Sequence, residues 1–88
     1  MPRTIWKYPL SISGEQTVLM PRDAEILCLK KQGDSICLWA EVVPGRSIEP
    51  RYFQIYGTGH EIDPNLDKRY VGTFFMSGGS LVFHVFEI

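Results

Sequence analysis

A chain of 88 residues with a net charge of −1, 44% hydrophobic and 22% charged residues has the composition of one small globular domain, residues 1–88. With a pI of about 6.1, it has no single-sign field to attract a nucleic acid or an anionic membrane, so we expect neither as a partner. No apolar run approaches the roughly 20 residues of a membrane span, and residues 1–8 lack the apolar core of a signal peptide. We therefore expect a cytoplasmic protein, and its two cysteines are too few for a disulfide framework.

The first quarter of the chain predicts two short strands joined by a turn. Residues 3–8 are β-prone, and Pro9 should close this strand because proline cannot donate to a β-ladder. Residues 11–15 read as a turn. Residues 16–20 form a second strand, which Pro21 should end.

Residues 25–32 and 35–43 predict a β-hairpin around Gly33. A loop at residues 32–33 would place Cys28 opposite Cys37, whereas a loop at residues 33–34 would place Cys28 opposite Trp39. Both registers give the same core face, which consists of Leu27, Leu29, Ile36, Leu38, Ala40 and Val42. The other face is mixed, so we expect Trp39 to be partly exposed.

Residues 44–50 have prolines at both ends and predict a loop, followed by a strand over residues 51–56. The Gly-Thr-Gly-His segment at residues 57–60 should break that strand. Residues 61–68 predict a turn or a single helical turn. The chain shows no amphipathic segment of helical period.

The last nineteen residues carry the strongest local signal, a β-hairpin with Gly78-Gly79 in its turn. Its register predicts three pairs on one face: Met76 with Leu81, Phe74 with Phe83, and Gly72 with Val85. The other face should pair Phe75 with Val82, Thr73 with His84, and Val71 with Phe86. Neither face is polar, so one must pack on the rest of the domain and the other must meet loops, the N-terminal strand or a second subunit.

Six to seven short strands with turn signals every eight to twelve residues predict an all-β fold. The expected architecture is a small antiparallel sandwich or a partly open barrel that ends in the C-terminal hairpin.

One candidate site for a small ligand is the segment Gly57, Thr58, Gly59 and His60. Its glycines could let the backbone N–H groups cradle an anion, with Arg51 and Arg69 supplying positive charge. The segment opens no helix and matches no phosphate-binding loop, so a simple strand end with positive-φ glycines is the competing interpretation.

The evidence for a catalytic or a metal-binding site is weaker than that for a ligand site. His84 lies among apolar neighbours, where a hydrogen bond to Thr73 or to a backbone carbonyl is a simpler role than catalysis. The set Cys28, Cys37, His60 and His84 lacks the Cys-x-x-Cys spacing of a zinc site. The acids Glu61, Asp63 and Asp67 suit a solvated loop better than a carboxylate pair. We predict no catalytic residue, no metal and no cofactor.

Aromatic and apolar side chains of the two hairpins are the candidate interface. The candidate interface residues are Trp39, Phe75, Val82, His84 and Phe86.

Five stretches of the chain carry a resemblance to a known family. They are Thr4-Ile5-Trp6-Lys7-Tyr8-Pro9-Leu10, Leu38-Trp39-Ala40, residues 53–60, Tyr70-Val71-Gly72-Thr73 and residues 81–87. In these stretches the chain resembles a family of small proteins encoded by bacteriophages and prophages, a domain of unknown function. The resemblance implies a phage or prophage origin and a bacterial cytoplasmic setting, and it transfers no catalytic residue.

Three functions are therefore open. The expected one is a non-enzymatic interaction protein that self-associates and binds a host or phage protein. The second is a protein that binds or sequesters a small nucleotide-type ligand at residues 57–60. The third is a small hydrolase that uses His60 or His84 with a loop acid.

Overall fold

The computed structural model describes residues 1–12 and 14–88, and the secondary structure in them is almost entirely β. The strands are β1 (Thr4–Leu10), β2 (Glu15–Pro21), β3 (Glu25–Gln32), β4 (Ser35–Val42), β5 (Ile48–Gly57), β6 (Arg69–Met76) and β7 (Leu81–Glu87). A single 3₁₀ turn, η1 (Ser77–Gly79), joins the last two strands. Within these residues no helix has the length and apolar character needed to cross a membrane.

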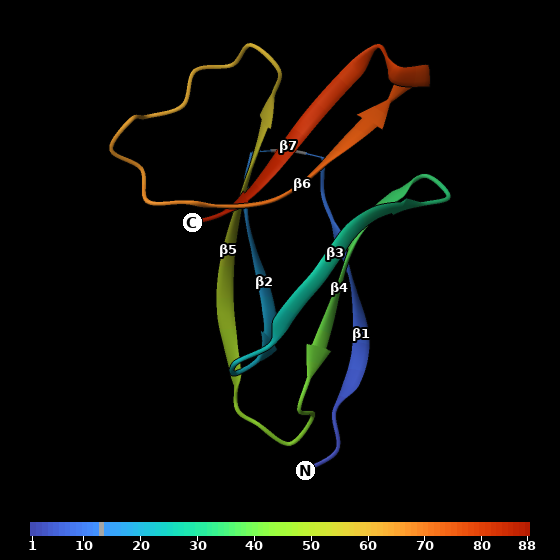
Figure 1. Cartoon of the computed structure of the whole chain (residues 1–88), viewed down its shortest axis with the longest axis vertical. Coiled ribbons are helices and arrows are strands. Elements are labelled where there is room, and N and C mark those ends of the chain that lie inside the picture. The colour runs from blue at the N-terminus through green and yellow to red at the C-terminus, as the bar shows by residue number, and fades with distance from the viewer. Residues whose placement is uncertain (13) are drawn as a thin grey trace.

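The strands form two antiparallel sheets, one in the order β1-β4-β3 and the other in the order β2-β5-β7-β6. The two sheets make the layers of an open sandwich, in which β3 lies beside β6 without hydrogen-bonding to it (Figure 1). The connection from β5 to β6 has to pass the central strand β7, and it projects to one side of the body as a long loop. The predicted all-β sandwich with a C-terminal hairpin is confirmed.

The core lies between the two sheets and takes alternate side chains from their central strands, as the period of a β-strand dictates. Phe53 and Val85 contribute from the four-stranded sheet, and Leu38 and Val42 contribute from the three-stranded sheet; all four are fully buried. The complete cluster is Leu10, Met20, Ala24, Ile36, Leu38, Ala40, Val42, Phe53, Ile55, Phe74 and Val85. Alternation leaves the outer face of each sheet to solvent.

The β3–β4 hairpin has the register with Cys28 opposite Trp39, as the loop at residues 33–34 predicts. A β-bulge between Ile26 and Cys28 turns Ile26 and Leu27 to the faces opposite those expected. Ile26 packs against the core, whereas Leu27 is 47% exposed. The placement of Leu27 in the core was therefore wrong, because one extra residue in a strand turns the next side chain to the opposite face.

The β6–β7 hairpin has the predicted pairs from Met76 with Leu81 down to Gly72 with Val85. The predicted pair of Val71 with Phe86 is wrong. A second bulge, between Tyr70 and Gly72, makes Val71 the extra residue and puts Tyr70 opposite Phe86. Val71 consequently packs against the core.

Three proline boundaries also differ from the sequence predictions. β1 continues through Pro9 to Leu10, and β2 includes Pro21. Both are edge strands, where a missing N–H costs no ladder hydrogen bond. β5 begins at Ile48 rather than after Pro50. Pro50 pairs with β2, and β7 does not extend to this part of β5, so the missing N–H of Pro50 costs no hydrogen bond to β7.

The remaining connections agree with simple turn chemistry. The expected turn at residues 11–15 includes Ser13, which lies outside the described residues. Residues 61–68 form a turn rather than a helical turn, closed by the Leu66 N–H donating to the Asp63 carbonyl at 3.1 Å. The β2–β3 turn places Asp23 at a φ of 63°, a conformation that aspartate tolerates better than most residues.

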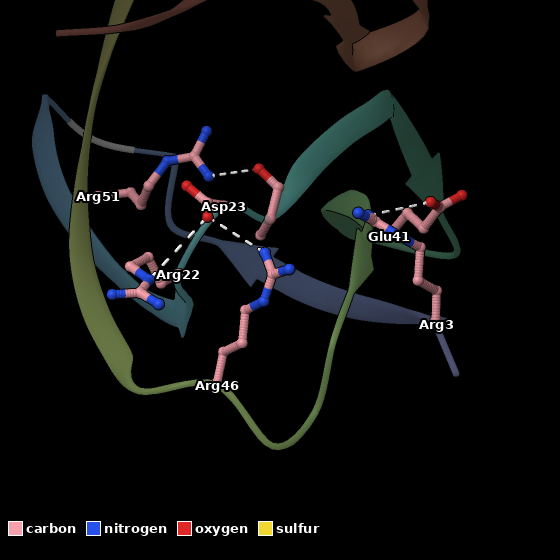
Figure 2. Close-up of polar contacts among 7 residues, drawn as sticks. Arg3, Arg22, Asp23, Glu41, Arg46 and Arg51 are labelled. Atoms are coloured by element: carbon pink, nitrogen blue, oxygen red, sulfur yellow. Dashed lines mark hydrogen bonds and ion pairs between the residues drawn. The ribbon is translucent and has the colours of Figure 1, made fainter. Parts of the chain in front are cut away.

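Arginine side chains hold this β2–β3 turn against both neighbouring segments. Asp23 Oδ2 accepts a hydrogen bond from Arg46 Nη1 at 3.1 Å, and Arg22 Nε lies 4.0 Å from the same oxygen. Arg51 Nη1 donates to the Ala24 carbonyl at 2.7 Å. Figure 2 shows Arg46 and Arg51 reaching this turn from other segments of the chain, with Arg22 in the turn itself.

Candidate interaction face

The outer face of the four-stranded sheet is rich in aromatic side chains. Its outward positions include Glu15, Thr17 and Leu19 on β2, Tyr52, Gln54 and Tyr56 on β5, Val82, His84 and Phe86 on β7, and Tyr70, Thr73 and Phe75 on β6. We call Tyr52, Tyr56, Tyr70, Phe75 and Phe86, with His84 among them, the aromatic face. Among these outward positions only Glu15 carries a formal charge.

Phe86 is the centre of the aromatic face. Tyr70 and Tyr56 contact it edge-on, with ring centroids 5.6 and 6.0 Å away. The ammonium group of Lys68 lies 5.7 Å from the Phe86 centroid, within the range of a cation–π contact. These contacts hold the rings of Tyr56, Tyr70 and Phe86 against one another, so this part of the face is preorganised.

His84, on β7 opposite Tyr56, has both ring nitrogens bonded to threonine hydroxyls. Its Nε2 is 2.7 Å from Thr58 Oγ1, and its Nδ1 is 2.9 Å from Thr73 Oγ1. The Tyr70 hydroxyl lies 2.6 Å from Thr73 Oγ1. The predicted hydrogen bond between His84 and Thr73 is confirmed, and it belongs to a chain of four side chains.

One direction of donation satisfies this chain for a neutral imidazole. The Tyr70 hydroxyl donates to Thr73, Thr73 donates to Nδ1 of His84, and Nε2–H of His84 donates to Thr58. The Thr58 hydroxyl can then donate to the Val82 carbonyl at 3.4 Å. With this direction of donation the ring proton of His84 is on Nε2.

The structure brings together four of the five predicted interface residues. Phe75, Val82, His84 and Phe86 all point outward from β6 and β7. Phe75 is 59% exposed. Trp39 is half-buried on the outer face of the other sheet, where it lines an apolar hollow with Ile5 and Leu27. It therefore belongs to a different surface of the sandwich.

The predicted anion cradle at residues 57–60 has most of its amides already engaged in hydrogen bonds within the turn or to β7. The Gly57 N–H donates to Nδ1 of His60 at 3.1 Å, and the Thr58 N–H donates to the Val82 carbonyl at 3.0 Å. The His60 N–H donates to the Gly57 carbonyl at 3.1 Å. Gly59 has a φ of 90°, which a glycine adopts without strain. These contacts describe a turn closed by its own histidine.

Arg51 and Arg69 lie at the opposite end of β5 from this turn. Arg51 makes a two-pronged ion pair with Glu87, in which Nη2 donates to Oε1 at 2.8 Å and Nε donates to Oε2. The two side chains are only 21% and 17% exposed. This hydrogen bond is the main reason that the pKa of Arg51 is raised above its ordinary value, and burial opposes it. The pair fastens the end of β7 to β5.

The candidate metal ligands are on separate sheets. Cys28 and Cys37 lie on β3 and β4 as free thiols, whereas His84 lies on β7 and His60 follows β5. Within residues 1–12 and 14–88, no group of three or more His, Cys, Asp or Glu side chains is placed to hold a metal ion.

Residues 1–88 match the family model described as "Domain of unknown function (DUF7352)". The chain belongs to this family. No curated protein and no solved structure matches it. The family description names no activity, so it assigns no role to any residue of the aromatic face.

The interface residues predicted from the sequence of this DUF7352 chain did not include Tyr52, Tyr56 or Tyr70. Tyr70 reaches the outer side only because of the bulge at Val71. The signal that could have indicated the bulge is Gly72, since an isolated glycine inside a strand often marks one.

Proposed function

We propose that this chain is a non-enzymatic interaction protein that self-associates through the aromatic face. The observation that carries the proposal is an outer sheet face with large exposed rings and almost no charge. Tyr70 and Phe75 are each 59% exposed, and Tyr52 is 45% exposed. Exposed aromatic patches of this kind mark interaction sites, and tyrosine is enriched at the energetic centres of interfaces.

The low charge of the face favours a second copy as its occupant. In a two-fold interface each surface patch meets its own copy, so a charged patch would place like charges together. Here Glu15 is on the edge strand β2, and Lys68 lies over Phe86. A net charge of −1 also leaves little long-range repulsion between two chains.

The size of the sheet bounds the strength of this association. Four strands of about seven residues span roughly 440 Å² by the ordinary strand spacing and rise. A standard interface buries about 800 Å² per partner. We therefore expect a dimer that dissociates in the micromolar range rather than a permanent one.

A non-enzymatic role is supported by the contacts of the two histidines. Both nitrogens of His84 are bonded to threonine hydroxyls, and Nδ1 of His60 is bonded to the Gly57 N–H. Within the described residues neither ring contacts a carboxylate that could orient it as a general base.

A phage or prophage origin, a bacterial cytoplasmic setting and a host or phage protein as the final target complete the proposal. They rest on the resemblance carried by stretches such as residues 4–10 and 53–60.

Sedimentation equilibrium over about 10–300 μM protein tests the self-association, since this range brackets a micromolar dissociation constant. The chain should show a concentration-dependent rise from monomer to dimer. Phe75→Lys should abolish the rise, because it places two like charges in the contact. Ile5→Lys is the matched control, since Ile5 is 56% exposed on the outer face of the other sheet. A monomer at every concentration, or an equal loss in both variants, would refute self-association through the aromatic face.

A further inference from the structure

A cavity of about 480 Å³ lies between β3 and β6, on the side of the sandwich away from β1 and β2. Its volume is within the range of small-molecule sites in proteins, about 300–1,000 Å³. The cavity is separate from the turn at residues 57–60.

Two opposed β-bulges make this cavity. Leu27 is the extra residue on β3, Val71 is the extra residue on β6, and both line it. Just beyond the bulges the strands approach closely, because a Cβ on Gly72 would lie 2.9 Å from Leu29 Cβ. β-bulges are over-represented beside functional sites, where they redirect side chains. Here two of them open the same gap.

One side of the cavity is lined by an ion pair. Arg51 and Glu87 line it and neutralise each other through two hydrogen bonds, and Arg51 also donates to the Ala24 carbonyl. This pair is rigid and polar, and it adds no net charge to the cavity.

Three further charged residues line the cavity: Asp23, which is paired with Arg46, and Arg69 and Glu25. Within residues 1–12 and 14–88, neither Arg69 nor Glu25 has a hydrogen-bond or ion-pair partner. A guanidinium without a partner suits a carboxylate, and a carboxylate without a partner suits an ammonium group. Ile26 and Val71, both partly buried, supply apolar surface to the same cavity.

We propose that this cavity binds a small zwitterion, an α-amino acid or a dipeptide. The carboxylate of the ligand would bind Arg69, its ammonium group would bind Glu25, and its apolar side chain would lie against Ile26 and Val71. A ligand with phosphate groups alone would leave Glu25 unpaired beside an anion. The site is independent of the aromatic face, apart from Tyr70, which borders both.

NMR titration of the ¹⁵N-labelled chain with L-leucine and L-phenylalanine tests the proposal. Amide shifts should move at residues 24–28 and 69–72 and saturate by about 10 mM, well above a millimolar dissociation constant. The amide of each amino acid lacks the carboxylate, and its N-acetyl form lacks the ammonium group. Both derivatives should bind at least about tenfold more weakly, because each loses a charge-assisted hydrogen bond.

Arg69→Gln and Glu25→Gln should each weaken binding at least about tenfold by the same reasoning. Lys31→Gln and Glu15→Gln are the matched controls, because both side chains are exposed and line no part of the cavity. They should leave binding unchanged. The Phe75→Lys chain should bind as the wild type does, which separates this site from self-association.

Absence of saturable shifts with both amino acids would overturn the proposal. So would equal binding of the amides or the N-acetyl forms, or saturable shifts that lie outside the two bulged segments.

Discussion

Gly72 of β6 lies directly against Leu29 of β3. A Cβ built on Gly72 would come 2.9 Å from Leu29 Cβ and 3.0 Å from its Cδ2. Only a glycine allows the two sheets to approach this closely, and the contact lies beside the cavity between β3 and β6. The same glycine follows the bulge at Val71, which brings Tyr70 to the aromatic face.

Gly72→Ala should destabilise the fold by about 1–3 kcal/mol, the usual cost of inserting a methyl group into a packed site. The neighbouring atom is a Cβ, which cannot swing away without moving its strand. Gly45→Ala is the control, since the nearest atom to its new Cβ is the end of the Met1 side chain at 3.7 Å. Urea unfolding measures both, and equal midpoints would contradict the close approach.

The Arg51–Glu87 ion pair should be costly to break from one side. Glu87→Gln leaves the Arg51 charge half-buried without its partner, and we expect a loss of about 3 kcal/mol in the free energy of unfolding. Arg51→Met combined with Glu87→Leu removes both charges and should cost far less. Arg3→Gln is the control for an exposed pair, the one with Glu41, and should change stability by less than about 1 kcal/mol. A single variant as stable as the wild type would refute the structural role of the pair.

Tyr8 should make the fold sensitive to alkaline pH. Its hydroxyl is buried and has no hydrogen-bond partner among residues 1–12 and 14–88, and burial raises the pKa of Tyr8 above 10.0. The folded state therefore holds this proton more tightly than the unfolded state. The resulting stability is complete below about pH 10 and is lost as pH rises from there through the raised pKa.

Tyr8→Phe removes both the unpaired hydroxyl and its titration. The variant should be more stable than the wild type by about 1 kcal/mol at neutral pH, since a buried unsatisfied group is lost. Its advantage should widen above about pH 10. Urea midpoints at several pH values measure this, and a less stable variant would show that the hydroxyl has a partner.

The hydroxyl chain through His84 should contribute to stability. Thr73→Val keeps the shape of the side chain but leaves Nδ1 of His84 and the Tyr70 hydroxyl without their shared partner. We expect a loss of about 1–2 kcal/mol. Thr17→Val, on the exposed edge strand β2, is the matched control. Thermal unfolding measures both, and equal melting temperatures would contradict the network.

The sequence predicted the strands well because most of the chain follows the simple period of two. The pairs from Met76 with Leu81 to Gly72 with Val85 came directly from that period and from the Gly-Gly turn. Leu27 and Val71 could not be placed in the same way. A bulge adds one residue to one strand, and its position depends on the packing of the opposite sheet.

The candidate site was only partly predictable. Phe75 and Phe86 share a face because they are neighbours in one hairpin. Trp39 was grouped with them because it is aromatic, although strand order, which the sequence does not reveal, puts it on the other sheet. Tyr56 joins the face only because β5 pairs with β7.

An isotope-filtered NOE experiment tests the proposed self-association most directly. The sample is a one-to-one mixture of ¹³C-labelled and unlabelled chains at a concentration that favours the dimer. We predict intermolecular NOEs among the rings of Tyr70, Phe75 and Phe86, and their loss in Phe75→Lys but not in Ile5→Lys. Intermolecular NOEs confined to the other sheet, around Trp39 and Ile5, or none at all, would contradict the account.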